Sequence, residues 1–88
     1  MKYTVELSNR AKKELKQIDR YQAKLITHWL YANIDQRANP REHGKPLTEK
    51  LKGYWRYRVG NYRIICEIKD SELVVVAVNI GHRREIYG

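Results

Sequence analysis

The feature that most constrains the fold is a pair of alternating segments, residues 54–59 and 62–68, joined by the dipeptide Gly60-Asn61. Alternation of polar and apolar side chains predicts half-buried β-strands, and a two-residue connection of this composition predicts a tight hairpin. The run at 73–80 is almost continuously apolar, which predicts a central strand covered on both faces, or nearly so. This part of the chain is therefore expected to form three consecutive strands.

The first part of the chain predicts one further strand and two helices. Residues 2–7 alternate in polarity, which is typical of a half-buried strand, and Ser8 and Asn9 then offer side-chain oxygens that can cap a helix. Two amphipathic helices are expected to follow, joined near Asp19, with the second covering about residues 20–36. The residues expected to face the core are Ala11, Leu15 and Ile18 in the first helix, and Leu25, Ile26, Trp29, Leu30 and Ile34 in the second.

These elements predict a single α+β domain over residues 1–88 with the order β-α-α-β-β-β. The sheet is expected to have four strands, to be largely antiparallel, and to be packed by the N-terminal helical hairpin. The Asn39-Pro40 step and the stretch after it break the helical pattern, so a connecting segment is expected there.

The composition limits what such a domain can bind. Eighteen Lys and Arg against ten Asp and Glu give a net charge of +8, which favours nucleic acid, an acidic membrane surface or an acidic protein as partner. A well-solvated basic domain is the plain alternative. The N-terminus has no apolar stretch of signal-peptide type, and the run at 73–78 is far below the ~20 residues of a membrane span, so a cytoplasmic setting is expected.

Cofactor and metal chemistry have little support in the sequence. The three histidines show no metal-ligand spacing, and the chain has no glycine-rich phosphate loop. Cys66 is the single cysteine, which excludes an internal disulfide, and its inward strand position favours a small apolar core residue. No metal and no cofactor are expected.

The hairpin predicts where the arginines point. With Gly60 and Asn61 as the turn, Arg58 lies directly opposite Arg63, and alternation places Arg56 on the same face. Opposed like charges destabilise a sheet by several tenths of a kcal/mol, and such a local cost is expected at functional sites. An anion would relieve the repulsion, and a guanidinium is well shaped for phosphate. The other face is expected to be the core face, with Trp55, Tyr57, Val59, Tyr62, Ile64 and Cys66.

The end of the chain is expected to join this arginine cluster. If Leu73 pairs with Ile68, Val78 lies beside Arg63, and residues 81–84 emerge at the sheet end that carries the Arg58–Arg63 pair. His82, Arg83 and Tyr87 then come within reach of the arginines. The alternative is a solvated basic sheet face followed by a disordered tail.

The same positions carry a resemblance to a known family. The segments Leu-Lys-Gly-Tyr-Trp-Arg-Tyr-Arg-Val-Gly-Asn-Tyr-Arg at 51–63 and Gly-His-Arg-Arg-Glu-Ile-Tyr at 81–87 resemble the RelE toxins of the RelE/ParE superfamily. The predicted strand and helical hairpin fit too, so the resemblance covers essentially the whole chain. It implies a toxin of a type II toxin–antitoxin pair that enters the ribosomal A site and cleaves the mRNA codon there. The ribose 2′-hydroxyl attacks the adjacent phosphate in that reaction, without a metal.

The resemblance also implies roles for individual residues. Arg56 and Arg58 match the basic residues of the first hairpin strand, Arg63 and Arg83 match the transition-state arginines, and Tyr87 matches the catalytic tyrosine. Arginine cannot exchange protons at ordinary pH, whereas histidine and tyrosine can, so either His82 or Tyr87 is expected to move the proton. Lys52 and Arg84 are expected to bind RNA.

Two other functions stay open from the sequence. The ParE branch of the superfamily contains non-nucleolytic poisons of DNA gyrase, although these usually lack the full set of arginines, histidine and tyrosine. An inactive RNA- or antitoxin-binding module is the other alternative. In the toxin hypotheses the protein partner is an antitoxin that covers the basic face with an acidic, helical segment.

Overall fold

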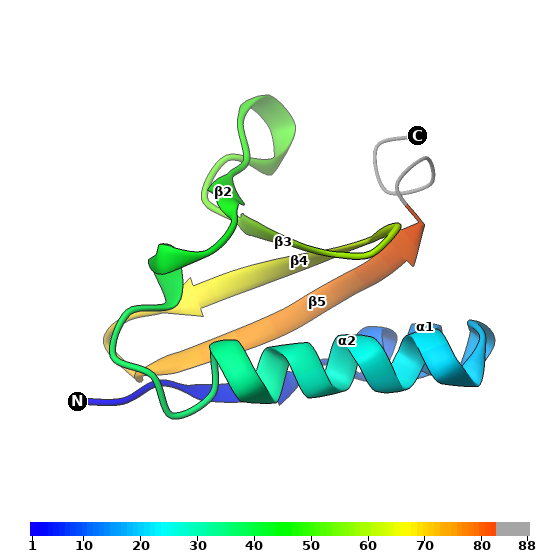
Figure 1. The fold of residues 1–88 in the computed structure, drawn as a ribbon. Coiled ribbons are helices and arrows are strands. Elements are labelled where there is room, and N and C mark those ends of the chain that lie inside the picture. Colours follow the sequence, from blue (N-terminus) through cyan, green and yellow to red (C-terminus); the bar gives the residue numbers. More distant parts are fainter. Residues whose placement is uncertain (83–88) are drawn as a thin grey trace.

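The structure, a computed structural model, describes residues 1–82 of the chain. In this part, two helices lie on one face of a five-stranded sheet (Figure 1). The strand order is β1-β5-β4-β3-β2, so the long strand β5 is interior to the sheet. The elements are β1 (Thr4–Leu7), α1 (Asn9–Gln17), α2 (Arg20–Asn33), β2 (Lys45–Pro46), β3 (Trp55–Val59), β4 (Tyr62–Lys69) and β5 (Val74–His82), with short 3₁₀ helices at Pro40–Glu42 and Glu49–Leu51.

The expected α+β class and helical hairpin are confirmed, but the sheet has one strand more than expected. The additional strand, β2, has only two residues, and it pairs antiparallel with β3 through Lys45 opposite Arg56 and Pro46 opposite Trp55. Proline is tolerated here because β2 is an edge strand. The sheet is also mixed, because β1 runs parallel to β5, with Thr4 opposite Val74.

The β3–β4 hairpin has the predicted register. Val59 pairs with Tyr62 and Arg58 pairs with Arg63 across the turn. Gly60 has a positive φ of 59°, which a two-residue hairpin turn requires at its first central position and which glycine adopts without steric cost. The local sequence was therefore sufficient to fix this pairing.

The predicted β4–β5 register is wrong. Ile68 pairs with Val75 instead of Leu73, and Arg63 lies beside Gly81 instead of Val78. The turn before β5 ends in Leu73, whose φ of 55° is left-handed, so the strand begins one residue later than expected. A register shift between Ile65 and Cys66 then leaves Val78 as an extra residue on β5, as in a β-bulge.

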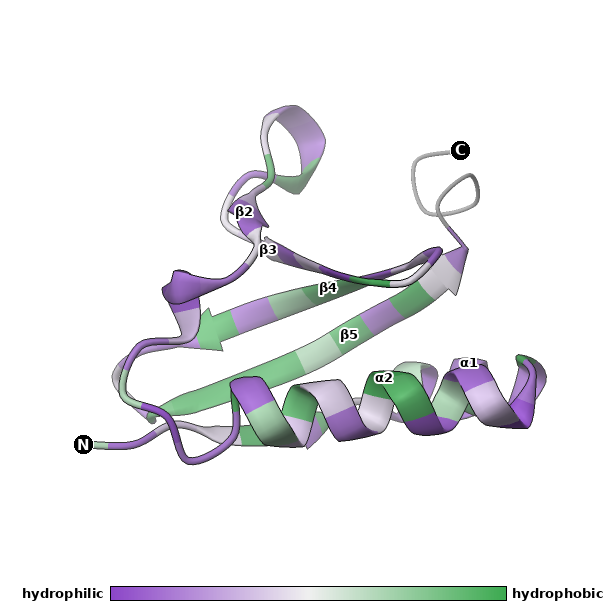
Figure 2. Cartoon of the chain, in the orientation of Figure 1, coloured by the Kyte–Doolittle hydropathy of each residue, from purple (hydrophilic) through white to green (hydrophobic). Residues whose placement is uncertain are grey.

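The core lies between the helices and the sheet, and local capping sets where the helices begin. The Ala11 amide donates to the Ser8 hydroxyl at 3.0 Å at the start of α1, as the sequence predicts. Figure 2 shows β5 to be hydrophobic along most of its length. The fully buried core side chains include Ala11, Ile26, Leu30, Ile34, Tyr57, Ile64, Cys66 and Val75.

The second helix differs from its prediction at two points. It ends at Asn33, with Ile34 as its C-terminal cap, rather than near residue 36. Leu25, expected in the core, is 40% exposed, whereas its neighbour Ile26 is fully buried. Successive helical residues are rotated by about 100°, so the stripe centred on Ile26 and Leu30 leaves Leu25 at its margin.

Residues 40–46, which we call the strap, cross from the helices to the edge of β3. Two aromatic side chains of β3 donate hydrogen bonds to the backbone of the strap. The Trp55 indole Nε1 donates to the His43 carbonyl at 2.7 Å, and the Tyr57 hydroxyl donates to the Pro40 carbonyl at 2.6 Å. Arg41 of the strap donates through both terminal nitrogens to the Asp70 carboxylate, at 3.0 and 2.9 Å. The strap is thus tied to the sheet at several points.

The Arg41–Asp70 pair predicts a weak acid sensitivity. The hydrogen bonds that Arg41 donates to the Asp70 carboxylate lower the pKa of Asp70 to about 2, and a hydrogen bond from the Tyr3 hydroxyl is the second cause. Because the unfolded value is about 3.9, this stabilisation is complete above about pH 4 and is lost as the pH falls through about 2. The pair is solvent-exposed, so we expect it to contribute less than about 1 kcal/mol to the free energy of unfolding.

Thermal unfolding at pH 5, 3 and 2 tests this expectation. Wild type should lose more stability across that range than Asp70→Asn, and Glu67→Gln, which alters an exposed β4 carboxylate, should behave like wild type. Parallel losses in wild type and Asp70→Asn would show that the ion pair contributes nothing.

Candidate functional site

Four basic residues lie on the sheet face opposite the helices, and we call this surface the cationic face. Lys45 and Arg56 are direct neighbours across β2 and β3, and Arg58 and Arg63 are direct neighbours across β3 and β4. Directly opposed residues share a face, and alternation along β3 places both pairs on the same one. The prediction that Arg56, Arg58 and Arg63 share a face is therefore confirmed.

The cationic face concentrates positive charge along one row of the described sheet, which runs across β3, β4 and β5. Gly81 continues the row of Arg58 and Arg63 on β5, so the strand residues of this row, all within residues 1–82, include no carboxylate. Arg58 is exposed, whereas Arg63 is only 9% exposed. Holding two guanidiniums opposite one another costs stability. An anion bound over the row would offset this repulsion.

Arg56 contributes a hydrogen-bond donor that no described residue accepts. Its Nε atom is buried and has no hydrogen-bond partner among residues 1–82. Buried donors are nearly always paired in folded proteins, so this donor is available to a water molecule, an ion or a ligand. The cationic face thus offers both charge and an unused donor.

Lys45 is a site residue that the sequence prediction missed. It lies beside Arg56 because β2 pairs with β3 for two residues. A two-residue strand that contains proline shows no alternation, so periodicity could not have revealed it.

The other residues expected at the site lie in different places. His82 reaches the sheet end that carries Arg58 and Arg63, but it is paired with Tyr62 and shares the helix-facing side of the sheet with that residue. The two rings meet edge-to-face, with centroids 5.7 Å apart. Lys52 is exposed in the segment before β3, at the opposite end of that strand from Arg58. Arg83, Arg84 and Tyr87 lie outside the described residues.

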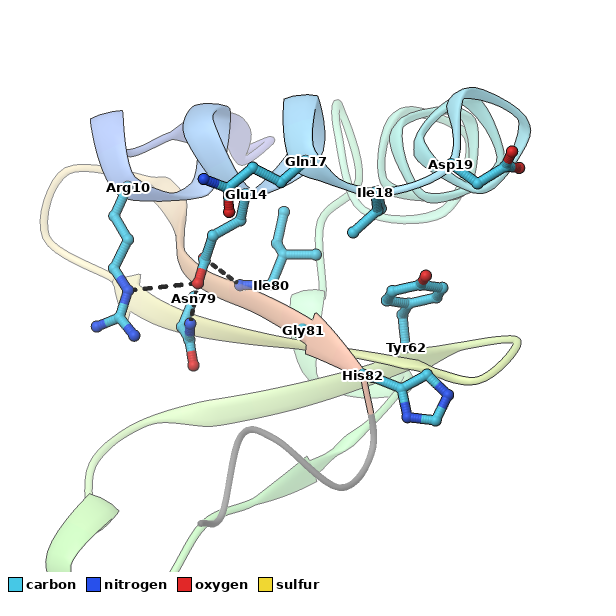
Figure 3. Close-up of a pocket in the computed structure, with 10 residues that line it drawn as sticks. All are labelled: Arg10, Glu14, Gln17, Ile18, Asp19, Tyr62, Asn79, Ile80, Gly81 and His82. Carbon is cyan, nitrogen blue, oxygen red and sulfur yellow. Dashed lines mark hydrogen bonds and ion pairs between the residues drawn. The ribbon is translucent and has the colours of Figure 1, made fainter.

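A cleft of about 620 Å³ lies between α1 and the ends of β4 and β5 (Figure 3). Tyr62 and His82 line one side, and Glu14 of α1 reaches into it. The Glu14 carboxylate accepts hydrogen bonds from the Ile80 amide and from the Asn79 side-chain amide, both at 2.7 Å. Because β1 pairs with β5 only as far as Ala77, Glu14 takes the place of a strand neighbour for the last part of β5.

Three further observations concern the described residues alone. No group of three or more His, Cys, Asp or Glu within residues 1–82 is placed to hold a metal ion. None of the helices in this part combines the length and apolar character needed to cross a membrane. Cys66 is fully buried, and burial raises the pKa of its thiol, so it is an unreactive core residue, as expected.

Comparison with known proteins agrees with this arrangement. Residues 5–87 match the family described as ParE toxin of type II toxin-antitoxin system, parDE. Toxin RelG of Mycobacterium tuberculosis is 29% identical over 87 residues, which cover 99% of this chain and 98% of that protein.

Solved structures of toxin–antitoxin complexes have the same fold. The complex RelBE2 from Mycobacterium tuberculosis aligns with a TM-score of 0.85 and 26% identity, over 97% of this chain and 95% of that chain. The archaeal RelE–RelB complex from Pyrococcus horikoshii aligns with a TM-score of 0.69 and 17% identity, over 97% of this chain and 99% of that chain. The chain belongs to the ParE toxin family of type II toxin–antitoxin systems, within the RelE/ParE superfamily.

Proposed function

We propose that this toxin is an endoribonuclease that cleaves messenger RNA in the ribosomal A site and thereby stops translation in the cytoplasm. The observation that carries the proposal is the direct pairing of Arg58 with Arg63 on the sheet face opposite the helices. Arginine binds phosphate through two parallel hydrogen bonds. A row of two such groups suits a substrate that becomes more negative during the reaction.

The proposed reaction is an attack by the ribose 2′-oxygen on the adjacent phosphorus. The new O2′–P bond forms as the P–O5′ bond breaks, which gives a 2′,3′-cyclic phosphate and a 5′-hydroxyl. The proton of the 2′-hydroxyl passes to a base, and the leaving 5′-oxygen receives a proton from an acid. Arg58 and Arg63 stabilise the charge that builds up on the phosphorane oxygens, and Arg83 is proposed to assist them.

Proton transfer requires a group other than arginine. His82 and Tyr87 are the candidates, and the position of His82 bears on the choice between them. Its ring contacts Tyr62 on the helix-facing side, away from the face on which the arginines stand. We therefore assign proton transfer to Tyr87. Lys52 and Arg84 are proposed to bind RNA phosphates.

The protein partner follows from the relatives. The solved structures of RelBE2 and of the archaeal RelE–RelB are toxin–antitoxin complexes, so we propose that this toxin is likewise held inactive by an antitoxin. A positively charged surface selects an acidic partner. An acidic helical segment over the cationic face would neutralise the arginines and keep RNA out.

Inhibition of DNA gyrase without RNA cleavage is the second candidate, because the matching family carries the ParE name. One experiment separates the two. The toxin is added to a coupled translation extract, mRNA 5′ ends are mapped by primer extension, and a gyrase supercoiling assay is run alongside. We expect in-frame cuts that require ribosomes, retained by His82→Gln and lost in Tyr87→Phe. Gyrase inhibition without cuts would overturn the proposal.

A further inference from the structure

A small notch opens at the outer edge of β3, next to the cationic face and separate from the cleft of Figure 3. Its volume is about 320 Å³, and it lies where the strap passes β3 beside α2. It combines aromatic rings with cations, a mixture that the proposed phosphate chemistry does not require. The residues that line the notch are Trp29, His43, Gly44, Lys45, Arg56 and Arg58.

The aromatic part of the notch is a pair of rings held edge-to-face. The centroids of Trp29 and His43 are 5.5 Å apart with an interplanar angle of 74°. Trp29 is itself fixed against Tyr57 of β3, with centroids 5.4 Å apart. Both Trp29 and His43 are partly exposed. The notch therefore presents ring surface to the outside on a rigid support.

The strap fixes the position of His43 closely. The Trp55 indole holds the His43 carbonyl at 2.7 Å, and the next residue, Gly44, has a φ of 77°. A Cβ at Gly44 would lie 2.2 Å from the Arg56 carbonyl oxygen, so only glycine allows the strap to approach β3 this closely. His43 is thus placed before any ligand arrives, which lowers the entropic cost of binding.

The cations of the notch are shared with the cationic face. Arg58 and Arg56 line the notch, and the Nε of Arg56 is buried with no hydrogen-bond partner among the described residues. A ligand that spans both surfaces would meet guanidiniums and aromatic rings side by side. Proteins bind single-stranded nucleic acid with this combination, because cations follow the phosphates while bases stack on rings.

We propose that the notch holds one unstacked base of a single-stranded RNA, stacked on His43, with the adjoining phosphate at Arg56 and Arg58. The inference rests on the proposed function in taking RNA as the ligand, and it deepens that function by naming a base-binding subsite. An acidic peptide would satisfy the guanidiniums but would leave the rings unused. The chemistry of the notch therefore favours RNA over a protein segment.

Binding to short RNA in the absence of ribosomes tests the subsite. A labelled single-stranded hexanucleotide and a chain of the same length without bases are titrated by fluorescence anisotropy at low salt. His43→Ala is expected to lower the affinity for the hexanucleotide about tenfold, which is the order of effect that loss of one base–aromatic contact gives. The affinity for the abasic chain should not change. His43→Phe should restore most of the loss. Arg58→Ala should weaken both chains equally.

His28→Ala is the matched control, because it removes an exposed imidazole from α2 outside the notch. Equal affinity of wild type for both chains, or an unchanged hexanucleotide affinity in His43→Ala, overturns the subsite. So do NMR shifts of the His43 ring that occur with hexaglutamate but not with RNA, because they make the notch a protein-docking site. Base-dependent binding by a toxin that cuts no mRNA overturns the proposed function and leaves the subsite standing.

Discussion

Replacing Arg58 by alanine is expected to slow RNA cleavage by about 10²–10³-fold, the usual effect of removing one preorganised donor from a transition state. The same substitution should leave the protein as stable as wild type or slightly more stable. Arg58 is exposed and stands directly opposite Arg63, so its removal relieves a like-charge contact that costs a few tenths of a kcal/mol. Activity and stability should therefore change in opposite directions.

The measurement pairs primer-extension cleavage rates with urea unfolding of each variant. Arg58 is a better test than Arg63, because Arg63 is only 9% exposed and its removal would alter packing as well as charge. Arg20→Ala, which removes an exposed arginine at the start of α2, should retain full activity. An Arg58→Ala protein that is less stable and still fully active would show that the pair is structural.

Replacing Glu14 by alanine is expected to lower the free energy of unfolding by about 2 kcal/mol. The Glu14 carboxylate accepts from the Ile80 amide and the Asn79 side chain, and charged hydrogen bonds of this kind contribute about 1.5–3 kcal/mol. The Glu14 side chain is 21% exposed, so water can replace only part of these hydrogen bonds when the carboxylate is removed. Glu14→Gln should cost less, because the amide oxygen can still accept from Ile80.

Urea unfolding and amide hydrogen exchange measure this effect together. The Ile80 amide should exchange faster in Glu14→Ala than in wild type, because its acceptor is gone. Glu6→Ala, at an exposed position of β1, serves as the control and should change neither quantity by much. Unchanged protection of Ile80 would mean that the end of β5 is held by other contacts.

Local signals in the sequence predicted most of the fold. The Gly60-Asn61 turn fixed the pairing of Arg58 with Arg63, because a two-residue turn leaves little freedom in register. The β4–β5 register was not predictable in the same way. Leu73 takes a left-handed conformation and Val78 is an extra residue, and neither feature has a reliable signal in a continuously apolar run.

The candidate site was predicted where it depends on one hairpin and missed where it depends on tertiary contact. Alternation placed the three arginines correctly. His82 was expected beside them, but the true register pairs it with Tyr62 and turns it to the other face. Lys45 and His43 belong to the strap, whose position follows from Trp55 and Gly44 and has no periodic pattern of its own.

The parallel pairing of β1 with β5 has a consequence for biosynthesis. Among the described strands, β1 pairs with β5 alone, through Thr4–Leu7 and Val74–Ala77. The first strand therefore has no strand partner until β5 has been synthesised. The row of Arg58 and Arg63 continues to Gly81 of the same strand, β5. A nascent chain therefore has neither a closed core nor a strand beside Arg63 until β5 has been synthesised. The toxin cannot complete its sheet on the ribosome before β5 has emerged.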